Sequence, residues 1–108
     1  MSMNPSVVAI IVNRINDHLK NSDRKFTGGP VPHITCRDGT RISVQTGESH
    51  YCRPRSNQGP WTHVEVMMMT KTTPIYFEYP ENDVAGYVPI ESVAQEILAR
   101  GNILMENR

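Results

Sequence analysis

The stretch that decides the fold is HITCRDGTRISVQ, residues 33–45. It predicts a β-hairpin, because an Asp-Gly pair between two alternating segments is a strong short-range hairpin signal. A three-residue loop over 37–39, with Gly39 in a left-handed conformation, places Ile34 opposite Ile42. A two-residue loop would mix polar and apolar side chains on each face, so the pattern favours the longer loop. The apolar face then contains Ile34, Cys36, Ile42 and Val44.

The other face of this hairpin is polar. Side chains along a strand alternate between its two faces, so the residues between the apolar ones share the second face. They are His33, Thr35, Arg37, Arg41, Ser43 and Gln45. We expect this face to be solvated or to bind a partner.

A helix is predicted from Pro5 to about Asn21. Asn4 is a good N-cap, and proline suits the first helical position because its missing N–H needs no partner there. Apolar residues recur with helical spacing at Val8, Ile11, Val12, Ile15 and Leu19. A strand is the alternative, since residues 7–12 are mostly β-branched. A loop over 22–32 follows, punctuated by a Gly-Gly-Pro triplet.

The second half of the chain predicts two strands and a helix. Residues 62–69 and 75–79 alternate as strands, with Val64, Val66 and Met68 on one face of the first. Residues 80–83 are predicted as a turn, and 86–88 as a lead-in to the last helix. That helix extends from residue 89 or 90 to Arg100 and ends at Gly101. Its apolar stripe contains Ile90, Val93, Ala94, Ile97 and Leu98.

The order of these elements, α-β-β-β-β-α, predicts an α+β fold. We expect an antiparallel sheet of about four strands with the N-terminal and C-terminal helices packed on one face. A chain of 108 residues and 12.2 kDa fits one domain, 1–108. Residues 1–4 and 102–108 are expected to fray, as chain ends commonly do.

The composition excludes several classes of protein. Apolar residues make up 38% and charged residues 20%, which is ordinary for a soluble domain. The longest apolar run, residues 7–12, is too short to cross a bilayer, and no signal-peptide pattern surrounds it. Two cysteines are too few for a disulfide-dense scaffold. We therefore expect no membrane association.

Two histidine–cysteine pairs raise the possibility of a zinc site. His33 and Cys36 form one pair, His50 and Cys52 form the other, and His63 follows. Two close pairs of such ligands could make a tetrahedral site. The spacing is unlike that of zinc fingers, however, and the hairpin register places His33 and Cys36 on opposite faces. We predict no metal, no cofactor and two unpaired thiols, with a Cys36–Cys52 disulfide as the alternative.

A catalytic cysteine is the next hypothesis. Cys52 stands between His50 and Arg53, which could supply a base and a cation that lowers the thiol pKa. No group is evident that would form an oxyanion hole, and no phosphate-binding loop or metalloprotease motif is present. We predict no catalytic residues, so the protein is expected not to be an enzyme, and a small Cys/His enzyme is the alternative.

Arginines and aromatic residues gather in the middle of the chain. Guanidinium groups bind phosphates and carboxylates through two parallel hydrogen bonds, and aromatic rings stack on bases. We therefore predict an anion-binding or partner-binding surface. The alternative is that Arg53 and Arg55 pair with Glu65, Glu78 or Glu81 and that Trp61 closes the core. The predicted binding residues are Arg37, Arg41, His50, Tyr51, Arg53, Arg55 and Trp61.

Three consecutive methionines, Met67 to Met69, end the strand predicted over 62–69. Alternation turns Met68 inward and its neighbours outward. Core filling or a dimer contact is favoured over a metal site, because thioether ligands matter mainly for copper. A homodimer that forms through this strand is therefore one of the alternatives.

Several motifs resemble a family of small, largely uncharacterised proteins encoded by tailed bacteriophages and prophages. They are DG (38–39), SVQ (43–45), HYCxPR (50–55), GPWTxVEV (59–66) and GYVP (86–89) with a closing helix, where x is any residue. The resemblance covers residues 34–101 and implies a phage origin and action in the host bacterial cytoplasm. No activity is attached to these motifs. Many small phage proteins inactivate host immunity by binding, including anti-CRISPR proteins and nucleotide-signal sponges. The expectation that this chain has such a role rests on analogy with them.

The sequence thus predicts a non-enzymatic phage accessory protein that counters a host defence. Its expected partner is a host defence protein, a nucleotide or a nucleic acid, bound through the arginine and aromatic residues. A phage structural or assembly subunit that uses the methionine strand as its interface is a further alternative.

Overall fold

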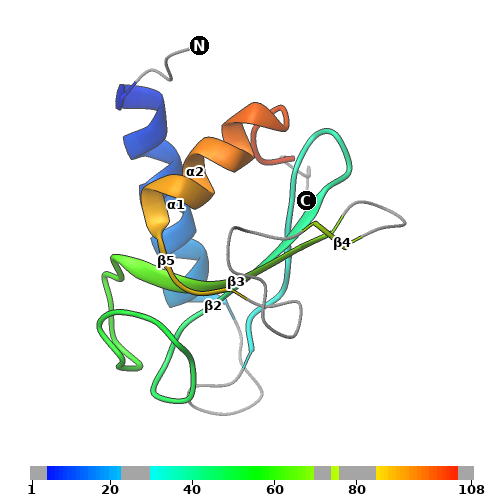
Figure 1. Cartoon of the computed structure of the whole chain (residues 1–108). Coiled ribbons are helices and arrows are strands. Elements are labelled where there is room, and N and C mark those ends of the chain that lie inside the picture. Colours follow the sequence, from blue (N-terminus) through cyan, green and yellow to red (C-terminus); the bar gives the residue numbers. More distant parts are fainter. Residues whose placement is uncertain (1–4, 23–29, 70–73, 76–84, 105–108) are drawn as a thin grey trace.

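The computed structural model describes residues 5–22, 30–69, 74–75 and 85–104, and it confirms the α+β fold class. Figure 1 shows two helices on one side of an antiparallel sheet. The helices are α1 (Pro5–Asn21) and α2 (Ile90–Ala99). The strands are β1 (Ile34–Thr35), β2 (Arg41–Gln45), β3 (His63–Met69), β4 (Pro74–Ile75) and β5 (Ala85–Pro89).

The sheet is four strands wide, as the sequence predicts. It has the order β1-β2-β3-β4, and β5 also pairs with β3. One edge of β3 is occupied by β2, so β4 and β5 share the other edge. β4 pairs near Met68 and β5 pairs from His63 to Val66. The segment expected as a lead-in to α2 is therefore a strand that completes the second edge.

The hairpin has the predicted register. Ile34 lies opposite Ile42, and the Cys36 N–H donates to the Thr40 carbonyl at 2.8 Å. Gly39 has φ 92°, the left-handed conformation that the three-residue loop requires. Asp38 accepts a hydrogen bond from the Thr40 N–H at 2.9 Å, which holds the pKa of the Asp38 carboxyl below its usual value. Local turn chemistry therefore decides this part of the fold.

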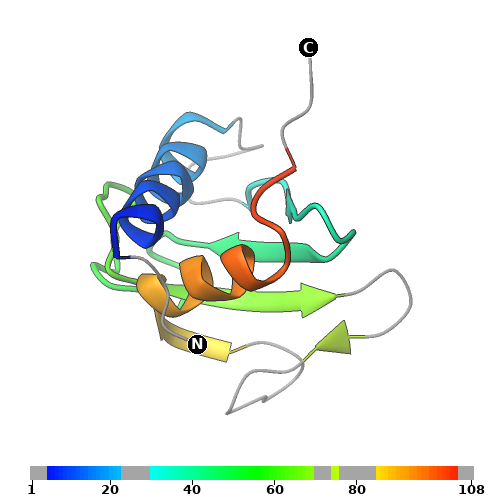
Figure 2. The same ribbon diagram turned by 90° about the horizontal axis from the view of Figure 1, so that it is seen from above.

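The core lies between the helices and one face of the sheet (Figure 2). The apolar stripes predicted for both helices are confirmed, except that Val12 and Leu98 lie at the margin of the core. The same side of the sheet contributes Ile34, Cys36, Ile42, Val44, Val64, Val66 and Met68, all of them buried. The inward direction of Met68 is also confirmed.

The segment after α2 is ordered further than the sequence suggests. Gly101 has φ 88° and ends the helix as predicted. Fraying is predicted from residue 102 onward; residues 102–104 instead pair with the hairpin, and residues 105–108 lie outside the described part of the chain. The Arg37 N–H donates to the Asn102 carbonyl at 3.0 Å, and the Leu104 N–H donates to the Thr35 carbonyl at 2.8 Å. An edge strand leaves backbone groups unpaired, and residues 102–104 satisfy them.

Some predicted features lie outside the described residues. They are residues 1–4, most of the loop over 22–32, the part of the 75–79 strand after Ile75, the turn at 80–83 and residues 105–108. The alternative that pairs Arg53 or Arg55 with Glu78 or Glu81 falls there too.

Candidate functional site

The second face of the sheet is partly covered by a loop, residues 46–60, which lies below the sheet in Figure 1. Glu65 of β3 holds this loop in place. One oxygen of its carboxylate accepts the Tyr51 N–H at 3.0 Å, and the other lies 3.1 Å from His50 Nδ1. The side chains of His50 and Glu65 are both largely buried. His50 therefore anchors the loop and is not presented to a partner.

Gln45 departs from the predicted polar face of the hairpin, because it is buried. Its amide exchanges two hydrogen bonds with the Val31 backbone, at 2.8 and 3.1 Å. The segment before β1 thus covers this end of the sheet. The expectation that Gln45 is solvated or binds a partner is wrong, since a tertiary contact satisfies its side chain.

Tyr51 and Tyr87 form an exposed aromatic pair beside the anchored loop. Their ring centroids are 5.7 Å apart and the ring planes are inclined by 45°. The Tyr87 N–H donates to the Tyr51 carbonyl at 2.9 Å, which ties β5 to the loop. Tyr51 remains 54% exposed and Tyr87 42% exposed. Two rings held by backbone contacts but open to solvent can accept a partner.

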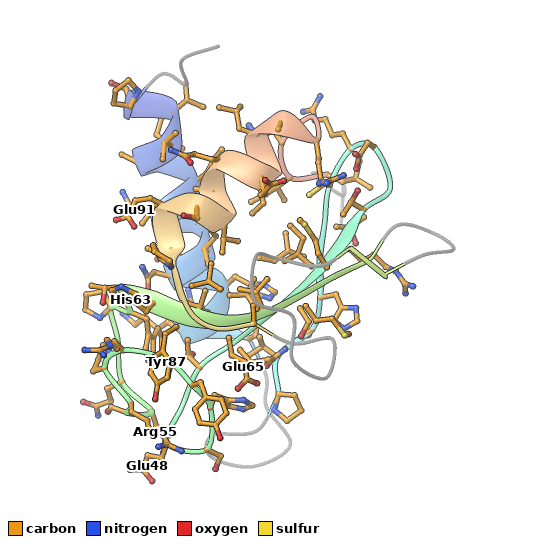
Figure 3. The ribbon with its side chains drawn as sticks, viewed as in Figure 1. Glu48, Arg55, His63, Glu65, Tyr87 and Glu91 are labelled. Atoms are coloured by element: carbon orange, nitrogen blue, oxygen red, sulfur yellow. The ribbon has the colours of Figure 1, made fainter. Side chains whose placement is uncertain are left out.

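Arg53 and Arg55 extend this pair. The Arg53 guanidinium carbon lies 5.4 Å from the centroid of the Tyr87 ring, and that of Arg55 lies 5.4 Å from the centroid of the Tyr51 ring. Arg55 Nε also donates to the Glu48 carbonyl at 3.1 Å. Figure 3 shows Arg55, Tyr87 and Glu48 on the side of the sheet away from the helices. We call the four residues Tyr51, Arg53, Arg55 and Tyr87 the Tyr–Arg surface.

The backbone within β5 has an irregular geometry that permits this arrangement. A bulge interrupts the pairing of β5 with β3 between Val64 and Val66. Gly86 lies so close to Tyr51 that an added Cβ would stand 2.8 Å from the Tyr51 Cβ. Tyr87 has φ 53°, a left-handed conformation that costs a bulky residue about 1 kcal/mol or more. This conformation leaves the Tyr87 ring exposed and beside the Tyr51 ring.

Tyr87 is not among the binding residues predicted from the sequence. Tyr87 follows a segment in which polar and apolar residues do not clearly alternate. The sequence therefore did not predict a strand that would bring Tyr87 near Tyr51. The available signal was the glycine itself, because glycine inside a strand often marks a bulge or a close approach of the backbone.

Trp61, predicted as a binding residue, lies in the core and is only 3% exposed. Its Nε1–H donates to the Ser56 carbonyl at 3.1 Å. Asn16 of α1 clamps its backbone, accepting the Trp61 N–H at 2.8 Å and donating to the Trp61 carbonyl at 3.3 Å. Trp61 therefore joins α1 to the loop and closes the core, as the alternative reading stated.

Arg37 and Arg41 are exposed but lie at the other end of the sheet. Arg41 pairs with Met69, whereas the loop is anchored at Glu65, four residues earlier on β3. At about 3.3 Å per residue these positions are about 13 Å apart. Arg37 lies beside Gly101. The structure therefore brings two of the predicted arginines together with Tyr51 and leaves the other two apart.

The cysteines do not form a reactive site. Cys52 is fully buried, and its Sγ lies 3.3 Å from the N–H and carbonyl of Gly47 and from the Pro54 carbonyl. His50 is held by Glu65, so no Cys–His pair is assembled. Among the residues that the structure describes, no three His, Cys, Asp or Glu side chains are grouped closely enough to hold a metal ion.

The Cys36 thiol should be protected by the fold. Burial raises its pKa to about 11, with Asp38 adding to the effect and Arg100 opposing it. We expect neither cysteine to react with a thiol reagent in the folded protein at about pH 8, and both to react on unfolding. Because the folded pKa lies above the unfolded value of 9.0, the stability from this thiol should decline between about pH 9 and pH 11. Rapid labelling of the native protein, a mass lower by two hydrogens or bound zinc would contradict this prediction.

Comparisons of the chain with protein-family models, with curated proteins and with solved structures find no match. The resemblance to a phage family therefore stays a prediction. No helix in the described ranges has the length and apolar character needed to span a bilayer.

Proposed function

We propose that this chain is a non-enzymatic binding protein and that an anionic partner binds to the Tyr–Arg surface. The observation that carries the proposal is the placement of two guanidinium groups beside two adjacent, exposed tyrosine rings. Guanidinium groups bind phosphates and carboxylates in a bidentate manner, and aromatic rings add contact area at low entropic cost.

The charges of the two arginines support this proposal. Within the ranges that the structure describes, no carboxylate forms an ion pair with Arg53 or Arg55. Their guanidinium groups lie over ring faces instead, which attract a cation weakly and use none of its N–H donors; Arg55 commits its Nε–H to the Glu48 carbonyl. Glu65, which anchors the loop to β3, is engaged by His50 and by the Tyr51 backbone.

The phage resemblance extends the proposal to a biological setting. It supports a small accessory protein that acts in the host bacterial cytoplasm and inactivates a defence component by binding. In that setting the partner is a defence protein, a nucleotide or a nucleic acid, and the two arginines with Tyr51 and Tyr87 make the contact.

We expect the protein to be retained on immobilised heparin at low salt even though its net charge is zero. Retention should decrease as salt rises, because salt screens exposed charges. The double variant Arg53→Glu/Arg55→Glu should lose retention and remain folded, since an exposed cation–π contact contributes about 0.5–1 kcal/mol. It should also fail to restore plaque formation on a host whose defence blocks the phage.

The matched control is Arg37→Glu/Arg41→Glu, which makes the same change of charge at the other end of the sheet. It should keep most of the retention. Equal loss in both double variants would mean that overall charge, and not the Tyr–Arg surface, binds the polyanion. Full activity of Arg53→Glu/Arg55→Glu would overturn the proposed function.

A further inference from the structure

We propose that the anionic partner of the Tyr–Arg surface is a single-stranded nucleic acid, an inference that rests on the proposed function. Two neighbouring aromatic rings and two arginines lie on one exposed face. They can make the two kinds of contact that an unpaired strand allows, stacking with its bases and ionic contact with its phosphates. Bases stack on aromatic rings whatever their sequence, and phosphates bind cationic side chains.

The tyrosine pair explains the preference for an unpaired strand. Tyr51 and Tyr87 are exposed and 5.7 Å apart, and they are held by the hydrogen bond between the Tyr87 N–H and the Tyr51 carbonyl. The bases of a duplex are stacked on one another, so their faces do not reach a side chain on a protein surface. A single strand can turn its bases outward onto aromatic rings or onto guanidinium planes. The pair therefore distinguishes a single strand from a duplex.

The arginines are placed to contact the backbone of the same strand. Each guanidinium lies over a different ring of the pair, so a base can stack on the exposed guanidinium plane as well as on a tyrosine ring, with the positive charge close to its phosphate. Contact with a ring restricts an arginine side chain before the ligand arrives, which lowers the entropy lost on binding. This arrangement combines a positive surface with stacking groups, as proteins that bind single strands do.

The surroundings favour a nucleic acid over an acidic protein. The segment that presents the arginines is polar and exposed: Arg53, Pro54 and Arg55 all face solvent. The cores of protein–protein interfaces are more apolar than this. Within the described ranges, the other exposed large apolar side chains are Ile10 on α1 and Leu104 after α2, and neither belongs to the Tyr–Arg surface.

The test is fluorescence anisotropy of the intact protein with a fluorescein-labelled oligothymidylate of about a dozen nucleotides. Three competitors are used: a duplex of equal length, an abasic oligonucleotide of equal charge, and polyglutamate. We expect the single strand to bind at least about tenfold more tightly than the duplex or the abasic strand, because stacking is the difference between them.

Variants separate stacking from charge. Tyr51→Leu and Tyr87→Leu should each weaken binding by about fivefold or more, whereas Tyr51→Phe and Tyr87→Phe should retain it. The double variant Arg53→Gln/Arg55→Gln should reduce the slope of log affinity against log salt by about 1.4, at about 0.7 for each phosphate contact on a single strand. Arg37→Gln/Arg41→Gln is the control and should leave the slope unchanged.

The outcomes distinguish this inference from the proposed function. Equal binding of the abasic strand or the duplex, or tighter binding of polyglutamate, would overturn the single-strand inference and leave an anion-binding surface standing. No binding of the oligonucleotide at about 100 μM, the weak end of non-specific affinity, would also overturn it. If heparin retention is insensitive to Arg53→Glu/Arg55→Glu as well, both proposals fail.

Discussion

Replacing Ile42 by aspartate should lower the free energy of unfolding by about 4 kcal/mol or more, enough to unfold much of the protein. Ile42 is fully buried in β2, with Ile34 opposite it on β1 and Met68 opposite it on β3. A carboxylate at this position would lie in the apolar layer beneath the helices, among buried apolar side chains. Urea denaturation followed by circular dichroism measures the effect.

Arg41→Asp is the matched control. Residue 41 precedes Ile42 on the same strand but is exposed on the other face. The same new charge there should change the free energy of unfolding by no more than about 1 kcal/mol, as is usual for an exposed charge. Equal stability of the Ile42→Asp variant and the parent would mean that the hairpin register is wrong.

Trp61→Ala should have the second largest effect, a loss of about 3–5 kcal/mol, as is usual for truncation of a large buried aromatic residue. The indole fills the space between α1 and the loop, and its Nε1–H bonds the Ser56 carbonyl. Its removal also weakens the site at which Asn16 holds the Trp61 backbone. Thermal or urea unfolding of the purified variant checks this prediction.

Trp61→Phe separates packing from hydrogen bonding. Phenylalanine keeps most of the apolar volume but leaves the Ser56 carbonyl without its donor. A smaller loss, of about 1–3 kcal/mol, is expected for that unpaired group and the reduced volume. If Trp61→Ala kept full stability and instead lost polyanion binding, Trp61 would be a contact residue and the core assignment would be wrong.

The binding surface depends on which side of the sheet each segment covers. The helices occupy one face, so the loop of residues 46–60 is free to lie on the other, where Glu65 anchors it. Figure 3 shows Glu91 of α2 on the helix side and Glu65 with Tyr87 on the loop side. The Tyr–Arg surface and the helix face are therefore separate, and variants of one should leave the other intact.

Much of the fold could be predicted from the sequence because it depends on interactions between near neighbours. The Asp38-Gly39 turn, the apolar stripes of the two helices and the alternation of β3 are all local patterns. Each of them links residues that lie close in the chain or repeat with the period of one element. The register, the helix bounds and the buried face of the sheet follow from them.

The binding surface could be predicted only in part. Tyr51, Arg53 and Arg55 lie within five residues of one another, so the sequence alone indicated that they cluster. Arg37 and Arg41 were added on the assumption that the hairpin packs beside the loop. The sheet separates them instead, because the loop is anchored near the start of β3 and the hairpin turn lies beyond its other end.

What the sequence determined by itself is the two helices, the hairpin and β3, together with the face that each of them buries. The tertiary structure alone decided that β5 shares an edge of β3, that Tyr87 joins Tyr51, and that Trp61 and Gln45 are buried. The physical reason is that a bulge removes the alternation by which a strand is recognised. A polar or amphipathic side chain, moreover, is buried only where another segment supplies its hydrogen-bond partner, as the Val31 backbone does for Gln45 and the Ser56 carbonyl does for Trp61.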